Sequence, residues 1–286
     1  ESSQLSTPMS RPHAWGRLRP MKAFILCGGQ GTRLREHTET RPKPMVEVGG
    51  RPILWHIMKS YAHHGIKDFV LCLGYKGEVI RDYFLNYQHR ACDVTVTLGK
   101  QSSVRVHADT HDEDGWTITL ADTGANTLTG GRIARAAAKH LAPDDTDFCI
   151  TYGDGVIDAD LSAILAFHRK HKGLATVTAV RPPSRFGELR ADPQGRAMAF
   201  EEKPQVSAGL INGGYLVVRR EFLSYISADE KCSLESVGLE SCAAAGQLFV
   251  YEHTGYWQCM DTHRDWMHLE DTWNRGDAPW AKWIKA

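Results

Sequence analysis

The sequence predicts an α/β protein whose centre is a mostly parallel, Rossmann-like β-sheet flanked by helices. Apolar, β-prone runs recur along the 286-residue chain, and helical patterns lie between the early ones. Strands that alternate with helices form βαβ units, and the strands of such units pair in parallel. Two of the runs lead directly into glycine clusters. Parallel sheets bind ligands at the carboxyl ends of their strands, so both clusters should open on one crevice.

Runs rich in apolar and β-branched residues predict the strands. In chain order the predicted strands are Ala23–Cys27, Phe69–Leu73, Val94–Leu98, Phe148–Tyr152, Ala175–Val180 and Ile211–Val218. Apolar residues at helical spacing predict the helices that lie between the early strands. These helices are Ile53–His63, Gly77–Tyr87 and Gly131–His140.

The C-terminal third of the chain is less regular. Arg185–Glu202 reads as short strands, and Thr262–Arg275 reads as a helix. The tail then carries Trp273, Trp280 and Trp283. Aromatic side chains bury large apolar areas, so we expect this tail to pack against the core or against a neighbouring subunit.

Composition limits the classes of partner. The 34 basic and 34 acidic residues cancel, which argues against a nucleic-acid partner. No apolar run approaches the roughly 18–20 residues of a membrane span. The seven cysteines are scattered with no CxxC pair, a pattern that fits free thiols in the cytoplasm.

The chain is long enough for one large α/β domain, which we place at residues 21–286. Residues 1–20 are rich in Ser, Pro and Arg and have no apolar stretch suited to a secretory signal. We expect them to be a flexible leader or a remnant of expression. A docking arm used in oligomerisation is the alternative.

The first glycine cluster predicts a phosphate-binding loop. Gly28, Gly29 and Gly31 follow the first strand, Arg33 comes next, and Lys43 stands between two prolines. Backbone N–H groups at the end of a strand suit phosphate oxygens, and nearby cations neutralise them. The alternative is a strand-to-helix turn whose glycines only supply positive φ. Neither a Walker loop nor a complete GxGxxG fingerprint is present.

Two aspartates are candidates for holding a metal ion. Asp154 directly follows a predicted strand and lies between Gly153 and Gly155. Mg²⁺ typically takes one or two carboxylates together with phosphate oxygens. An Asp-Gly pair is also common in simple turns, so a second acid is needed. Asp261 is the candidate, although it could instead cap the helix that follows.

Several motifs together resemble the sugar-1-phosphate nucleotidyltransferases. They are GGxGTRL and PKPM within residues 28–45, GDG at 153–155, EEKP at 201–204 and GYWQCMDT at 255–262. The segment DTG followed by TLTGGR at 122–132 resembles the glucose-1-phosphate cytidylyltransferases in particular. The resemblance extends from Met21 to about Trp283. It implies the nucleotide-diphospho-sugar transferase fold, with a smaller C-terminal part for sugar binding and oligomerisation.

The resemblance also implies which residues form the site. The implied nucleotide-binding residues are Leu26, Gly28, Gly29, Gln30, Gly31, Thr32, Arg33, Lys43, Thr127, Arg132 and Gly153. The implied sugar-phosphate-binding residues are Gly187, Glu202, Lys203, Asn212 and Gly213. Asp154 and Asp261 would hold Mg²⁺. Catalysis would depend on Arg33, Lys43, Asp154 and Lys203.

By this resemblance the activity is cytidylyl transfer from CTP to a sugar 1-phosphate, with α-D-glucose 1-phosphate as the expected sugar. The products would be a CDP-sugar and pyrophosphate, and the protein would be a homo-oligomer, a trimer or a hexamer. The same reaction with UTP, dTTP or another hexose 1-phosphate stays open. An inactive regulatory paralogue is a remote alternative. Val237-Gly238 and Cys259 depart from the family pattern, which leaves the exact sugar open.

Overall fold

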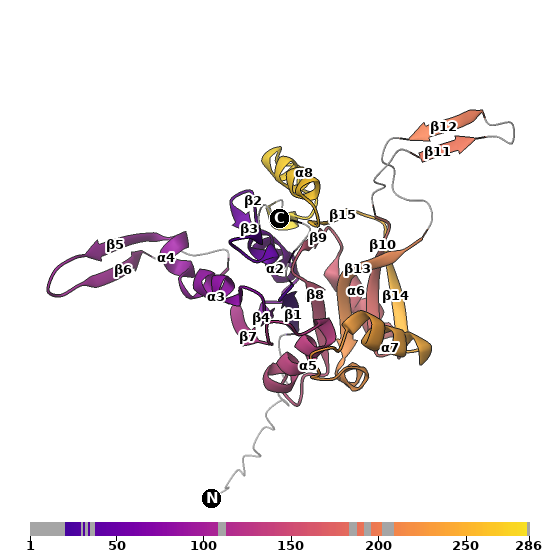
Figure 1. Ribbon diagram of the computed structural model, residues 1–286, viewed down its shortest axis with the longest axis horizontal. Helices are drawn as coiled ribbons and strands as arrows, with labels where there is room; N and C mark the ends of the chain where they lie inside the picture. The colour runs from indigo at the N-terminus through magenta and orange to yellow at the C-terminus, as the bar shows by residue number, and fades with distance from the viewer. Residues whose placement is uncertain are drawn as a thin grey trace, which may run out of the picture.

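The computed structural model describes residues 21–29, 31, 34, 38–107, 113–182, 188–191, 196–201 and 209–284. Its centre is a seven-stranded sheet (Figure 1). In spatial order the strands are β14 (Leu248–His253), β10 (Ala175–Val180), β13 (Ile211–Arg219), β8 (Asp147–Tyr152), β1 (Lys22–Cys27), β4 (Asp68–Leu73) and β7 (Thr117–Asp122). The pairs β8–β1, β1–β4, β4–β7 and β10–β14 are parallel. Only β13 runs antiparallel to its neighbours in this sheet, so the predicted mostly parallel sheet is confirmed.

Helices pack on both faces of the sheet. They are α2 (Ile53–His63), α3 (Gly77–Leu85), α4 (Tyr87–Ala91), α5 (Thr129–His140), α6 (Leu161–Lys170), α7 (Glu240–Ala244) and α8 (His263–Asn274). Short helical turns are η2 (Lys43–Met45), η3 (Arg220–Tyr225), η4 (Leu234–Leu239) and η5 (Lys282–Ile284). Among the described residues there are also four small two-stranded sheets. They pair β2 (Glu47–Val48) with β3 (Arg51–Pro52), β5 (Asp93–Thr97) with β6 (Ser103–His107), β9 (Gly155–Ile157) with β15 (Trp257–Cys259), and β11 (Glu188–Ala191) with β12 (Ala197–Glu201).

Strand β1 shows why the central runs are apolar at every position. Its side chains alternate between two cores, with Ile25 in the core that includes α2 and α8, and Phe24 in the core that includes α5 and α7. Both residues are fully buried. A strand covered on both faces needs apolar side chains at consecutive positions, which is the pattern that identified it in the sequence.

The aromatic tail packs against the core, which is one of the two arrangements expected from the sequence. The Trp280 ring is 1% exposed and stacks against Tyr256 and Trp273. Its Nε1 atom donates a hydrogen bond of 3.3 Å to Nδ1 of His56 in α2. Trp283 meets Trp55 edge to face. The tail therefore closes the core on the α2 side of the sheet.

One predicted strand lies in the wrong place. Val94–Leu98 was expected in the parallel sheet, but β5 instead pairs with β6 in a hairpin that projects from the body (Figure 1). Val96 is 55% exposed and Leu98 is 86% exposed. The alternation of valine and threonine fits any strand with two unlike faces, so it gave no information about the partner. The two edges of the central sheet are β7 and β14, and neither strand was predicted.

The other boundaries need smaller corrections. The helix predicted at Gly77–Tyr87 breaks at Asn86 into α3 and α4. Strands β11 and β12 lie within the segment 185–202 that was read as short strands. The predicted leader, residues 1–20, lies outside the described residues. Across the part of the chain that the structure describes, no helix has the length and apolarity to cross a membrane.

Candidate active site

The two glycine clusters meet at one edge of the central sheet. Strands β1 and β8 run parallel with Leu26 beside Tyr152, so the residues that follow each strand emerge together. The N–H of Gly153 donates a hydrogen bond of 3.1 Å to the carbonyl of Leu26. This confirms the single crevice predicted from the sequence. It contains a cavity of about 510 Å³ lined by Leu26, Gly28, Gly29, Gly31, Lys43, Pro44, Ala125, Asn126, Thr127, Leu128, Thr129, Arg132, Tyr152, Gly153, Asp154 and Asp261.

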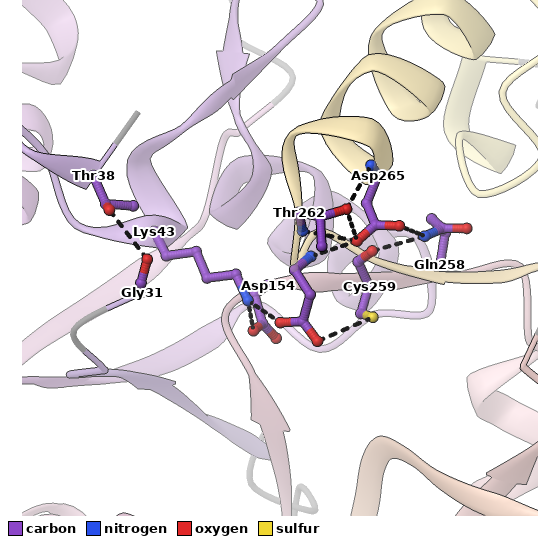
Figure 2. Close-up of polar contacts among 9 residues, drawn as sticks. Gly31, Thr38, Lys43, Asp154, Gln258, Cys259, Thr262 and Asp265 are labelled. Carbon is purple, nitrogen blue, oxygen red and sulfur yellow. Dashed lines mark hydrogen bonds and ion pairs between the residues drawn. The ribbon is translucent and has the colours of Figure 1, made fainter. Parts of the chain in front are cut away.

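Lys43 joins the two candidate metal-binding aspartates. Its Nζ atom lies 2.7 Å from Oδ2 of Asp154 and 2.5 Å from Oδ1 of Asp261. Figure 2 shows the Lys43 side chain extended toward Asp154 across the crevice. Burial opposes the charged ammonium, but the two carboxylates outweigh it and raise the pKa of Lys43. The cluster is therefore one cation held between two anions that remain partly open to solvent.

The backbone around Asp261 directs its carboxylate to this cluster. Thr262, not Asp261, is the N-cap of α8, and it forms a capping box with Asp265 (Figure 2). The Asp265 carboxylate accepts hydrogen bonds from the N–H groups of Thr262 at 2.8 Å and Asp261 at 3.1 Å. The alternative reading of Asp261 as a helix cap is wrong. Met260 N–H also donates to the Asp154 carbonyl at 2.8 Å, so the two acidic loops are tied together.

Glycine is required at two positions of the first loop. Gly31 has a φ of +61°, a conformation that side chains with a Cβ rarely adopt. A Cβ on Gly28 would lie 2.1 Å from Cζ of Arg132, so any larger residue would displace that guanidinium. The loop conformation and the position of Arg132 thus depend on each other.

Arg132 holds three loops of the crevice together. Its guanidinium is buried and donates five hydrogen bonds of 2.7–3.1 Å. The acceptors are the carbonyls of Gly28, Leu73, Gly124 and Ala125 and the hydroxyl of Thr123. Burial lowers the pKa of Arg132. Sequence reasoning gave Arg132 a direct role toward the nucleotide, which stays a prediction, and did not foresee this structural one.

Replacing Arg132 with Met should therefore destabilise the fold by about 3 kcal/mol, because buried carbonyls lose charged hydrogen-bond donors. The free energy of unfolding can be measured in urea. Lys139→Met is the matched control, since Lys139 is exposed on the same helix. It should change the stability by less than about 0.5 kcal/mol. A loss below about 1 kcal/mol in Arg132→Met would contradict this role.

A second cavity adjoins the first. Its volume is about 340 Å³, and its lining is Thr151, Tyr152, Asp154, Gly155, Asn212, Gly213, Gly214, Tyr215, Glu235, Trp257, Cys259 and Asp261. It shares Tyr152, Asp154 and Asp261 with the larger cavity. Asn212 and Gly213 were predicted on the sugar side, and both lie here. The acidic cluster therefore stands at the junction of two compartments.

Thr127 also lines the larger cavity. Its side chain is buried, and its hydroxyl accepts a hydrogen bond of 2.7 Å from Nη1 of Arg135. Six predicted site residues lie outside the described residues and stay predictions, namely Gln30, Thr32, Arg33, Gly187, Glu202 and Lys203. Sequence reasoning missed Tyr152, Glu235 and Trp257. Tyr152 could have been found as the last strand residue before Gly153, whereas Glu235 carries no local signal beyond the serine before Leu234.

Comparison with known proteins agrees with this geometry. The nucleotidyl transferase family matches residues 22–271. A glucose-1-phosphate cytidylyltransferase of Salmonella typhi is 47% identical over 264 residues, which are 92% of this chain and all of that protein. A mannose-1-phosphate guanyltransferase of Aspergillus fumigatus is 31% identical over 86% of this chain and 62% of its own length.

Among solved structures, HddC from Yersinia pseudotuberculosis superposes with a TM-score of 0.61. The match covers 88% of this chain and 99% of HddC, at 21% sequence identity, and supports the fold alone. The resemblance drawn from the motifs is confirmed by the sequence relatives. Because the family match spans most of the chain and includes both glycine clusters and both acidic loops, this chain belongs to the nucleotidyl transferase family.

Proposed function

We propose that this protein transfers a cytidylyl group from CTP to α-D-glucose 1-phosphate, giving CDP-glucose and pyrophosphate. The observation that carries the proposal is the meeting of Lys43, Asp154 and Asp261 where two cavities adjoin. Two substrates held in those cavities would present their phosphates to the same charged cluster. The choice of CTP and glucose 1-phosphate rests on the 47% identical relative, which bears that activity in its name.

The two aspartates fit a divalent cation, which we take to be Mg²⁺. Their carboxylates already converge on a positive charge, the Lys43 ammonium, and both are partly exposed toward the crevice. Mg²⁺ prefers such hard oxygen donors and completes its coordination with phosphate oxygens and water. When bound, it would neutralise phosphate charge and polarise a phosphoryl oxygen.

The protein's remaining task in the reaction is to position the two substrates. A phosphate oxygen of the sugar 1-phosphate attacks the α-phosphorus of the nucleotide in line, a new P–O bond forms, and the bond to pyrophosphate breaks. The protein forms no covalent intermediate, so its residues align the two phosphates and neutralise their charge. Lys43 serves the α-phosphate, and the amides of Gly28 and Gly29 serve the outer phosphates together with Arg33. Lys203 would hold the incoming phosphate.

We assign the base and the sugar to the two cavities in the same way. The larger cavity would hold the nucleotide, with the cytosine toward Thr127. The smaller cavity would hold the sugar near Asn212 and Gly213, and Glu202 would bind its hydroxyls. Hydroxyl groups and guanidinium groups can donate to the O2 and N3 acceptors of cytosine.

The test is to identify the product. The protein is incubated with CTP, α-D-glucose 1-phosphate and Mg²⁺, and the products are resolved by chromatography and mass spectrometry. CDP-glucose and pyrophosphate should form in equal amounts. Formation of a CDP-sugar only from another hexose 1-phosphate would overturn the choice of sugar. An absence of product with every nucleotide and sugar phosphate would favour the inactive paralogue.

We also propose a cytoplasmic location and a homo-oligomer, a trimer or a hexamer. The location is supported by seven free cysteines, since disulfides are rare in that compartment. The assembly is supported by the projecting β5–β6 hairpin, whose Val96, Leu98 and Val104 side chains are all exposed. Apolar residues gathered on an extension of this kind are typical of contacts between subunits.

A further inference from the structure

The side chain of Tyr152 lies between the two cavities. This residue ends strand β8, directly before Gly153, and it lines both compartments. Its phenol O–H donates a hydrogen bond to Oε1 of Glu235, a residue of η4 that lies far away in the sequence. Glu235 also lines the smaller cavity. The position of the Tyr152 side chain is therefore fixed by the Glu235 carboxylate, which no family motif in the sequence identified.

Glu235 is itself held firmly. Its Oε2 atom accepts hydrogen bonds from the hydroxyl of Thr129 at 2.6 Å and from that of Ser233 at 2.8 Å. Ser233 caps η4 by accepting from the N–H groups of Glu235 and Ser236. Burial would raise the pKa of the Glu235 carboxyl, but the donors from Thr129, Tyr152 and Ser233 outweigh it and lower the pKa. Glu235 is thus an ionised acceptor.

The direction of the next hydrogen bonds follows from that charge. Because a carboxylate only accepts, the Tyr152 proton points to Glu235 and the phenol oxygen is left to accept from elsewhere. Asn212 lines the same cavity as Tyr152, and its Oδ1 atom accepts from the N–H of Gly214 at 2.8 Å. Glu235 and Tyr152 are therefore joined by a hydrogen bond that the phenol donates.

We propose that Glu235 is a positioning residue of the sugar-phosphate compartment, acting through its hydrogen bond to Tyr152 to hold the Tyr152 side chain at the edge of that compartment. This inference rests on the proposed nucleotidyl transfer but not on which base is used. Glu235 lines the smaller cavity, whereas the glycine loop of the larger cavity is held separately by Arg132. The loss of Glu235 should therefore affect the sugar 1-phosphate more than the nucleotide.

The experiment compares Glu235→Gln with the unaltered protein, using whichever nucleoside triphosphate and sugar 1-phosphate give the fastest turnover. Glutamine keeps the shape but presents an amino group to hydroxyls that must donate. We expect the KM for the sugar 1-phosphate to rise about tenfold. The kcat should stay within about threefold, because the Arg132 contacts are unchanged. The nucleotide KM should rise less than the sugar-phosphate KM, although Thr129 of the larger cavity also donates to Glu235. Glu240→Gln, an exposed glutamate nearby, is the matched control and should change neither KM.

Tyr152→Phe keeps the ring and removes only its hydroxyl, so it tests the same hydrogen bond if Glu235→Gln folds poorly. It should raise the same KM, and the double variant should be no worse than the more affected single variant. In parallel, the rise in melting temperature caused by sugar 1-phosphate should shrink in both single variants. Any one of three results would overturn the proposal. They are an unchanged KM for the sugar phosphate, an equal rise in the KM of both substrates, and additive effects in the double variant.

Discussion

Replacing either Asp154 or Asp261 with asparagine should reduce kcat by about 10²–10³-fold and leave the fold intact. Each substitution removes one of the two carboxylates that converge at the junction of the cavities. A bound divalent cation contributes several kcal/mol to charge stabilisation in the transition state, and about 1.4 kcal/mol corresponds to a tenfold change in rate. Asparagine has nearly the same shape, so the tied acidic loops should keep their conformation.

The measurement combines kcat at saturating Mg²⁺ with the melting temperature in the presence and absence of Mg²⁺. The stabilisation by Mg²⁺ should disappear in both variants, and this result does not depend on activity. Asp277→Asn, at an exposed aspartate away from the crevice, is the control and should behave as the unaltered protein does. Near-normal turnover in Asp154→Asn or Asp261→Asn would remove that residue from the site.

Replacing Lys43 with Met should also reduce kcat by about 10²–10³-fold, since preorganised charge at a reacting phosphate contributes about 3–4 kcal/mol. The structure adds a second expectation. Without the ammonium, the Asp154 and Asp261 carboxylates would face each other with no cation from Lys43 between them. Mg²⁺ should therefore raise the melting temperature of Lys43→Met more than that of the unaltered protein, because it would relieve a repulsion that Lys43 otherwise neutralises.

Lys139→Met removes a positive charge of the same kind from an exposed position and should change neither quantity. An equal or smaller Mg²⁺ effect in Lys43→Met would show that the metal does not bind between the two aspartates. An unchanged kcat would show that the lysine only balances charge in the free protein.

The elements that the sequence predicted well are those whose residue pattern has one structural solution. Strands β1 and β8 are apolar at consecutive positions because helices cover both faces. Helix α2 has the predicted bounds, Ile53–His63, because its apolar residues recur at helical spacing. The prediction for strand β5 was wrong because its pattern has more than one structural solution. Alternation of apolar and polar residues does not distinguish a strand of the central sheet from a strand of an exposed hairpin.

Some contacts of the candidate site could likewise be predicted from the sequence, and others could not. The glycine loop and Asp154 could be brought together from the sequence, because the carboxyl ends of parallel strands share one edge. The contact between Lys43 and Asp261 joins residues 218 positions apart and depends on the capping box that turns Asp261 toward the crevice. Glu235 reaches the smaller cavity because η4 packs against α5, α7 and η3. No local pattern could have indicated that contact.

The central claim is cytidylyl transfer, and a competition among nucleotides tests it most directly. CTP, UTP, dTTP and GTP are mixed at equal concentration with Mg²⁺ and limiting α-D-glucose 1-phosphate, and the nucleotide-sugar products are quantified by mass spectrometry. Their early ratio gives the ratio of kcat/KM values. Cytosine has an amino donor at C4 where uracil has a carbonyl, which a matched site discriminates by about 1–3 kcal/mol or more. CDP-glucose should therefore exceed each other product by at least about fivefold. Equal amounts of CDP-glucose and UDP-glucose, or an excess of another nucleotide sugar, would contradict the cytidylyl assignment.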